Sequence, residues 1–208
     1  MVKNQQTSSE GIRYGDISET HVEMRDWKIS GNNVDEFYLE AEDGTYGHEL
    51  LTIKWPWQNV RIGKYCSISE GITLILGGEH KVSNISTYPF YQFADTWGDD
   101  CPVSLFTNGD ELVIGNDCWI GHGATILSGV HIGDGSVIGA KSVITKHTLP
   151  YSITVGNNRH IGFRFSKKQI ARLLVLRWWD WPKEKIKRYI PLLNSNEIDK
   201  FLREAENE

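Results

Sequence analysis

The sequence contains no apolar run of the ~20 residues that a membrane-spanning helix requires, so no membrane span is expected. Its formal net charge of −5 provides no basic footprint for nucleic acid. The N-terminal segment MVKNQQTSSE has no apolar core of signal-peptide type, and the three cysteines are odd in number and lack metal-binding spacing. We therefore expect a cytoplasmic protein that binds neither nucleic acid nor membrane.

The chain also lacks a G-x-S-x-G elbow, a phosphate-binding loop and a dinucleotide fingerprint. Its 20 glycines instead accompany a repeat of six residues. Isoleucine recurs at every sixth position from Ile114 to Ile144, and a shorter run with the same spacing occupies Ile62, Ile68 and Leu74. This period fits neither an α-helix nor a simple strand.

A period of six is typical of a hexapeptide β-solenoid, in which three six-residue faces close one coil of about 18 residues. The aliphatic side chain of each unit points into the prism, and a small residue four positions later packs beside it. Cys66 and Cys118 occupy such small positions, which predicts that both are core thiols rather than nucleophiles. The sequence therefore predicts a mainly β fold.

The spacing between Ile62 and Ile114 is not a multiple of six, so an insertion must interrupt the solenoid. We expect it to run from about 77 to 111. This segment is rich in aromatic residues, which are scarce in disordered chains, and this indicates an ordered loop. The predicted division is an irregular segment 1–33, a β-helix domain 34–165 and a helical extension 166–208.

The extension is predicted from helix signals after Pro150. Ser166 and Gln169 have capping-box spacing, Pro182 suits the first turn of a second helix, and Ser195 could cap a third. A solenoid needs a covered end. We therefore expect the helices to pack against the open end of the solenoid through three tryptophans, Trp178, Trp179 and Trp181.

Two chemical sites can be considered among the histidines. A zinc site would need three converging imidazoles, but His122, His131 and His147 occupy different positions of the six-residue unit, so no metal is expected. His80 is different, because it follows Gly77 and Gly78 at the start of the insertion. A histidine beside an aromatic loop could act as a general base.

Four segments together resemble the xenobiotic acetyltransferase family, which includes streptogramin and type B chloramphenicol acetyltransferases. They are IGKYCSI, GGEH followed by STYPF, the run IGNDCWIGHGATILSGVHIGDGSVIGAKSVITK, and WWDWP. The resemblance covers roughly residues 34–205. It implies a left-handed parallel β-helix, a homotrimer with active sites between subunits, and acetyl-coenzyme A (acetyl-CoA) as donor.

The resemblance also implies roles for individual residues. His80 matches the family's catalytic histidine and would remove the proton from an acceptor hydroxyl that attacks the thioester directly. Independently of the resemblance, the aromatic residues Tyr88, Phe90, Trp97 and Phe106 of the insertion favour an apolar acceptor wall, and Tyr38 is a candidate in the segment that corresponds to a tyrosine-rich acceptor stretch of the family. Coenzyme A would lie along an edge formed by Trp119, Gly121, Gly139, Ala140, Lys141, Thr145, Lys146 and Arg159.

Two segments depart from the family pattern. GNNRHIGFRF replaces the usual G-N-P-A-K/R segment, so the phosphates of coenzyme A could be met by Arg159, His160 or Arg164. EFYLEAEDGTYG replaces a tyrosine-rich acceptor stretch. The expected acceptor is a small molecule with a hydroxyl, with a streptogramin A or chloramphenicol type antibiotic as the family default. The alternatives are O- or N-acetylation of a nucleotide-linked or polysaccharide sugar, a non-catalytic trimeric binding module and, third, a zinc enzyme.

Overall fold

A computed structural model describes residues 12–13, 21–23, 37–98 and 110–208. Cys101, Phe106 and most of the predicted irregular segment 1–33 lie outside the described residues. Within the described part of the chain, no helix is long and apolar enough to cross a membrane.

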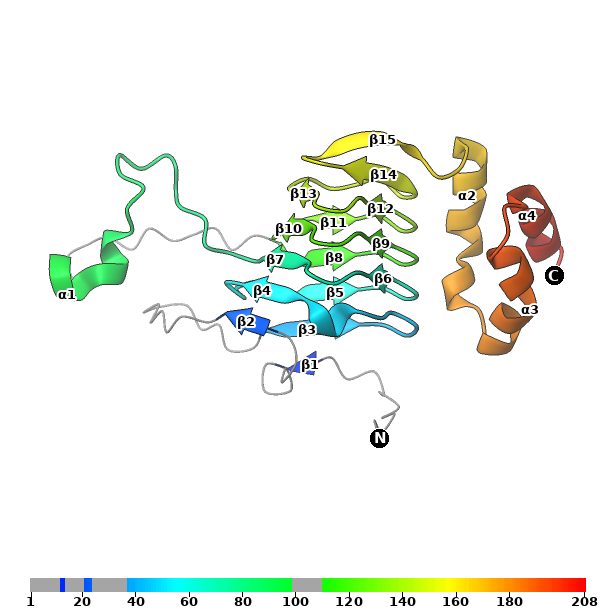
Figure 1. Cartoon of the computed structure of the whole chain (residues 1–208), viewed down its shortest axis with the longest axis horizontal. Helices are drawn as coiled ribbons and strands as arrows, with labels where there is room; N and C mark the ends of the chain where they lie inside the picture. Colours follow the sequence, from blue (N-terminus) through cyan, green and yellow to red (C-terminus); the bar gives the residue numbers. More distant parts are fainter. Residues whose placement is uncertain (1–11, 14–20, 24–36, 99–109) are drawn as a thin grey trace.

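Three five-stranded sheets form the faces of a prism, and the coils stack along its axis (Figure 1). Sheet 1 contains β1 (Ile12–Arg13), β3 (Tyr38–Ala41), β5 (Val60–Ile62), β8 (Leu112–Ile114) and β11 (His131–Ile132). Sheet 2 contains β2 (His21–Glu23), β4 (Thr52–Lys54), β7 (Thr73–Ile75), β10 (Thr125–Leu127) and β13 (Val143–Ile144). Sheet 3 contains β6 (Ser67–Ile68), β9 (Trp119–Ile120), β12 (Val137–Ile138), β14 (Ser152–Val155) and β15 (Arg159–Phe163).

The six-residue repeat sets the register of these sheets. Ile62 pairs with Ile114, which pairs with Ile132 in the next coil. The corresponding side chains of the other two sheets stack in the same way, and all of them are buried in one continuous core. Burial of each such side chain contributes roughly 1.5–3 kcal/mol. Cys66 and Cys118 are also buried in this core, which confirms the prediction for both thiols.

The coils stack so closely at their turns that some positions have no room for a side chain. A Cβ atom at Gly121 would lie 2.6 Å from the backbone nitrogen of Ala140 in the next coil. Such a contact is far below van der Waals distance, so glycine is required there. The turns that join sheet 1 to sheet 3 are stacked by backbone hydrogen bonds, for example from Tyr151 N to Asp134 O at 2.7 Å.

The insertion leaves the β-helix between β7 and β8, as the repeat spacing predicts. It contains a short 3-10 helix, η3 (Phe90–Phe93), and one turn of α-helix, α1 (Ala94–Trp97). In Figure 1 this segment projects well away from the stacked coils. The mainly β fold with parallel coils, an inserted loop and a C-terminal helical extension is therefore confirmed.

The extension consists of α2 (Lys167–Leu176), η4 (Trp178–Asp180), α3 (Lys183–Leu193) and α4 (Ile198–Glu206). Ser166 caps α2 with the predicted capping box. Pro182 lies one residue before α3. The expected cap at Ser195 is wrong, because α4 begins after Glu197 and the Ser195 hydroxyl donates to Leu192 O instead.

The predicted position of the extension is also wrong. The helices lie beside the stack of coils and not over its end (Figure 1). Trp179 is buried with Tyr151, Leu173 and Phe201, and the ring of Trp178 contacts that of Tyr65 at 5.0 Å between centroids. The reason is that the sheet 1–sheet 3 turns carry aromatic side chains, which give the helices an apolar surface along the side of the prism.

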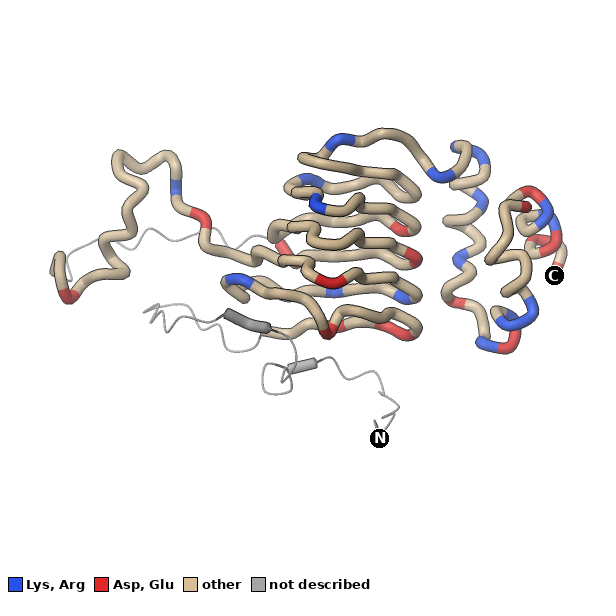
Figure 2. The backbone as a smooth tube through the Cα atoms, viewed as in Figure 1, with Lys and Arg blue, Asp and Glu red and all other residues tan. Residues whose placement is uncertain are grey.

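Ion pairs reinforce this contact. Lys64 Nζ lies 2.9 Å from Asp180 Oδ1, and Arg164 Nη1 lies 3.0 Å from Asp117 Oδ2. Figure 2 shows acidic residues on several of the turns that lie beside α2. Partly exposed pairs of this kind contribute little individually, so the buried aromatic cluster is the larger stabilising term.

Candidate active site

His80 lies just beyond β7, where the chain leaves the β-helix. Its Nδ1 atom is 2.6 Å from the carbonyl oxygen of Thr87, seven residues further along the same loop. A carbonyl oxygen can only accept, so Nδ1 carries the hydrogen and donates it. In the neutral imidazole the lone pair is then on Nε2. This tautomer is the one that can accept a proton at Nε2.

Two tryptophans that sequence analysis missed pack on the base of this loop. A Cβ atom at Gly77 would lie 2.5 Å from the Trp57 ring, and one at Gly78 would lie 2.9 Å from the Trp55 ring. Gly78 also has a φ of +84°, which side-chain-bearing residues rarely adopt. The rings therefore lie directly on the backbone two and three residues before His80. The segment WPW and the double glycine were both visible in the sequence.

The loop base is also joined to the neighbouring coil. The Ser128 hydroxyl donates to Glu79 Oε1 at 3.2 Å, from the turn between β10 and β11. This turn belongs to the sheet 2–sheet 1 edge of the prism, from which the inserted loop also leaves. Thr145 and Lys146 follow β13 at the same edge, one coil further along.

The loop brings three of the predicted acceptor-site aromatics together. The Tyr88 ring lies 4.8 Å from Phe90, the Phe90 ring lies 5.4 Å from Trp97, and Phe93 stacks on Tyr88 at 5.4 Å. All four rings are partly exposed, with Trp97 at 56%. The fourth candidate in the described residues, Tyr38, is separate: it lies on β3, and its hydroxyl donates to Glu111 at 3.0 Å.

The predicted coenzyme A residues are distributed over two edges and one face of the last coils. Gly121 and the segment 139–141 form stacked turns between sheet 3 and sheet 2, while Trp119 lies on β9 and is 55% exposed. Thr145 and Lys146 lie beyond β13, and Arg159 begins β15. The structure thus brings the glycines, Ala140 and Lys141 together but keeps Trp119 and Arg159 on separate strands.

Asn158 is a third residue that sequence analysis missed. Its Oδ1 atom accepts from Thr145 N at 2.8 Å, and its Nδ2 atom donates to Thr145 Oγ1 at 2.7 Å. Asn158 therefore holds both the backbone and the side chain of Thr145. It belongs to the GNNRHIG segment that departs from the family pattern, and only the fold shows which residue it contacts.

The described residues include no group of three or more side chains that could hold a metal ion. The rings of His131 and His147 lie 4.9 Å apart, but His147 Nδ1 accepts a hydrogen bond from the backbone of His131. His122 belongs to another turn, where its Nδ1 atom lies 3.8 Å from Glu70 Oε1. These three histidines do not converge on one point.

The repeat region matches a known protein family. The description "Bacterial transferase hexapeptide (six repeats)" covers residues 112–146. A chloramphenicol acetyltransferase from Morganella morganii is 39% identical over 140 residues, which is 66% of this chain and 67% of that protein. A probable macrolide acetyltransferase from Lysinibacillus sphaericus is 45% identical over 138 residues, 64% of this chain and 76% of that protein. A virginiamycin A acetyltransferase from Staphylococcus aureus is 40% identical over 145 residues, 68% and 66% of the two chains.

The fold and these relatives define a hexapeptide-repeat acetyltransferase, with the left-handed parallel β-helix of that class. The chain belongs to the xenobiotic acetyltransferase family. This identification confirms an enzyme and sets aside the alternative of a non-catalytic solenoid.

Solved structures that align with the chain include a maltose O-acetyltransferase from Clostridium difficile, at 22% identity and a TM-score of 0.45 over 62% of this chain and 60% of that chain. A galactoside acetyltransferase in complex with coenzyme A aligns at 29% identity and a TM-score of 0.41, over 56% and 55% of the two chains. The chain thus spans less than two thirds of these solved proteins.

Proposed function

We propose that this protein transfers the acetyl group of acetyl-CoA to a hydroxyl of a small molecule, with His80 as general base. The observation that carries the proposal is the hydrogen bond from His80 Nδ1 to Thr87 O, at 2.6 Å. It selects the tautomer with a basic Nε2 atom, and it would also stabilise the imidazolium formed during the reaction. Relatives named for antibiotic acetylation make a streptogramin A or chloramphenicol type molecule the first acceptor to test.

In this mechanism the acceptor oxygen attacks the thioester carbonyl carbon while its proton moves to His80 Nε2. The carbon–sulfur bond then breaks, the acetyl ester remains on the acceptor, and the sulfur of coenzyme A takes the proton from the imidazolium. A general base of this kind contributes ~10²–10⁴-fold to the rate. The Tyr88, Phe90 and Trp97 rings would form an apolar wall for the acceptor.

The predicted coenzyme A edge has suitable chemistry for this donor. Gly121 is buried against the next coil, whereas Ala140 in that coil is exposed and carries only a methyl group, which suits the close approach of an extended pantetheine chain. Lys146 and Arg159 are exposed cations that could pair with phosphate groups. Asn158 would position Thr145 beside them.

We also propose a homotrimer with active sites between subunits. The aromatic rings at the end of the inserted loop are 38–56% exposed and the loop projects away from its own β-helix (Figure 1). A contiguous exposed apolar group of this kind marks an interaction site. The loop of one subunit would then bring His80 toward the cofactor edge of its neighbour.

The test is release of free thiol from acetyl-CoA with virginiamycin M, chloramphenicol and nucleotide-linked amino sugars as acceptors. We expect His80→Ala to lower kcat by 10²–10⁴-fold with coenzyme A affinity unchanged. His131→Ala is the control, because His131 is an exposed histidine outside the proposed site. Near-normal turnover by His80→Ala would refute its role.

The acceptors in the same assay separate the two substrate classes. Histidine-dependent release with an antibiotic supports the leading proposal, whereas release only with sugars would move the enzyme to glycan acetylation. The second class has some support, because a putative colanic acid biosynthesis acetyltransferase from Escherichia coli is 30% identical over 115 residues. Asp95 in α1 would place a carboxylate beside the aromatic rings, which suits a polar acceptor.

A further inference from the structure

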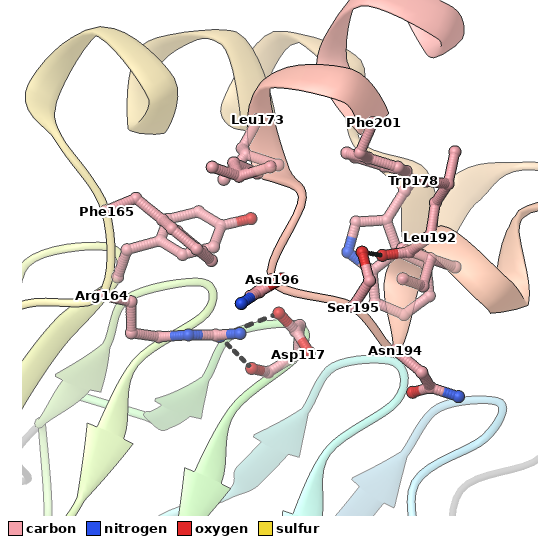
Figure 3. A pocket seen from close by; sticks show the side chains of 13 residues that line it. Asp117, Arg164, Phe165, Leu173, Trp178, Leu192, Asn194, Ser195, Asn196 and Phe201 are labelled. Atoms are coloured by element: carbon pink, nitrogen blue, oxygen red, sulfur yellow. Dashed lines mark hydrogen bonds and ion pairs between the residues drawn. The ribbon is translucent and has the colours of Figure 1, made fainter.

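A cavity of about 190 Å³ separates the helical extension from the sheet 1–sheet 3 turns (Figure 3). We call it the extension pocket. One wall is formed by Asp117, Tyr151, Arg164 and Phe165 of the β-helix and the segment after it. The other is formed by Leu173, Trp178, Phe201 and residues 192–196 and 198 of the extension. Drug-sized ligands occupy pockets of ~300–1,000 Å³, so this cavity is too small for coenzyme A or an antibiotic. It is a site separate from the proposed active site.

Arg164 and Asp117 form an ion pair at the floor of the pocket, and some of their hydrogen-bonding atoms are not engaged within the described residues. Arg164 Nη1 donates to Asp117 Oδ2 at 3.0 Å and to Gly135 O at 2.8 Å. Within the described residues, no hydrogen bond engages Arg164 Nε or Nη2, or Asp117 Oδ1. The guanidinium lies against the rings of both Tyr151 and Phe165, at 5.4 and 5.3 Å from their centroids.

Next to the ion pair, one polar atom among the described residues is buried without a partner. The Tyr151 side chain is 1% exposed, and in the described part of the chain its hydroxyl has no hydrogen bond. A buried hydroxyl without a partner is uncommon, because it costs about 1–3 kcal/mol in lost solvation. At the rim, Figure 3 shows the Asn196 amide directed toward the Arg164–Asp117 pair. The neighbouring Ser195 hydroxyl is engaged by Leu192 O and Glu197 N.

These groups select a ligand by charge and by geometry. The opposite charges of Asp117 and Arg164 neutralise each other. An anionic ligand would be repelled by Asp117 and a cationic ligand by Arg164, and either ligand would lose part of its solvation. A neutral planar group with both donors and an acceptor can use Asp117, Arg164 and the Asn196 amide together. A carboxamide has this pattern. The apolar remainder of the ligand would contact Leu173, Phe201 and other apolar side chains of the wall.

We propose that the extension pocket binds a small neutral molecule with a carboxamide group on an apolar body. Such a ligand would touch the β-helix and the extension at once. Because the ligand would bind only when the extension is packed against the β-helix, it would also raise the stability of the folded chain by mass action.

The experiment uses three probes of matched shape and different charge, namely benzamide, benzoate and benzylamine. Binding to the full-length protein is measured by ligand-observed NMR titration, with thermal unfolding as a second readout. We expect saturable benzamide binding and a higher Tm, with binding of the two charged probes weaker by at least about tenfold. Asn196→Leu should weaken benzamide binding about three- to tenfold, because one hydrogen-bonding group is lost.

Asn207→Leu is the matched control, because Asn207 is an exposed asparagine of the same extension outside the pocket. It should bind benzamide like the wild type. Both asparagines are exposed, so neither substitution should prevent folding. Absence of saturable benzamide binding, equal binding of all three probes, or unchanged binding by Asn196→Leu would each overturn the proposal.

Discussion

At the scale of single residues, His48 in η2 (His48–Leu50) is a partly buried histidine whose surroundings disfavour its protonated form. Its side chain is 23% exposed, and within the described residues its buried Nδ1 atom has no hydrogen bond. Glu49 Oε2 lies 3.6 Å away, too far for a hydrogen bond. Burial lowers the pKa of His48 below its ordinary value near 6.5, and attraction from Glu49 only partly opposes this. The fold therefore prefers the neutral imidazole.

This preference predicts a loss of stability in mild acid. Above pH 6.5 His48 is neutral in both states and contributes nothing; as the pH falls through that value the unfolded chain binds the proton more readily. We expect His48→Gln to lose less Tm than wild type between pH 7.5 and 5.5. His131→Gln, at an exposed histidine, should follow the wild-type curve. Identical curves for wild type and His48→Gln would contradict the prediction.

The sequence predicted inward-facing residues well, because burial in a stacked solenoid repeats with the period of the chain. Ile126 and Cys118 follow directly from that period. It did not predict the contacts of Trp55, Trp57 or Asn158, because each touches a residue from another coil or loop. Such contacts depend on how turns stack in space, which no local spacing records. The roles assigned to His80, the acceptor aromatics and the coenzyme A residues stay predictions.

At the scale of elements, the positions of the insertion and the extension along the chain were predictable, but the packing of the extension was not. A break in the repeat located the insertion, and the capping box located α2. The side on which the extension docks was not predictable, because it is chosen by the aromatic turns at Tyr65 and Tyr151. The division of the chain at residues 33 and 165 likewise stays a prediction.

The base of the inserted loop gives a prediction for catalysis. Gly78→Ala would force a Cβ atom against the Trp55 ring at a φ of +84°, so the loop must shift and displace His80. We expect kcat to fall at least about tenfold with coenzyme A affinity unchanged, since misplacement of a catalytic group by 1 Å can cost about 10²-fold. The measurement is steady-state kinetics with a separate binding titration.

Gly98→Ala is the matched control for this prediction. Gly98 has a similar φ of +86°, but in the described part of the chain no atom lies within 4 Å of its built Cβ position. It therefore tests backbone strain without the tryptophan contact. Adding Trp55→Ala to Gly78→Ala should recover part of the rate if the ring is the obstacle. Equal losses in Gly78→Ala and Gly98→Ala would remove the tryptophans from the explanation.

At the scale of the whole molecule, the proposed trimer leads to a complementation experiment. His80→Ala removes the proposed base, and Lys146→Glu reverses a charge at the proposed cofactor edge. If each site combines the loop of one subunit with the edge of its neighbour, mixed trimers of the two variants contain some sites with both groups intact. We therefore expect co-expressed variants to regain part of the activity that each lacks alone.

Mass measurement in solution provides the control for this experiment. Light scattering should give three times the 23.7 kDa of the chain for wild type, for each variant and for the mixture. A trimer whose mixture is as inactive as its parents would indicate that both groups come from one subunit. A monomeric mass would contradict the proposed assembly itself.

The stacked coils also fix distances along the axis of the prism in discrete steps. Neighbouring strands are ~4.8 Å apart, so the height between any two edge positions is a whole number of coils. The base of the inserted loop is joined to the coil of Ser128, and Thr145 lies one coil above it. Adding or deleting a coil between them would change their separation by one full increment and never by a fraction. Evolution can therefore change the distance between the loop base and Thr145 only by inserting or deleting a whole coil of about 18 residues.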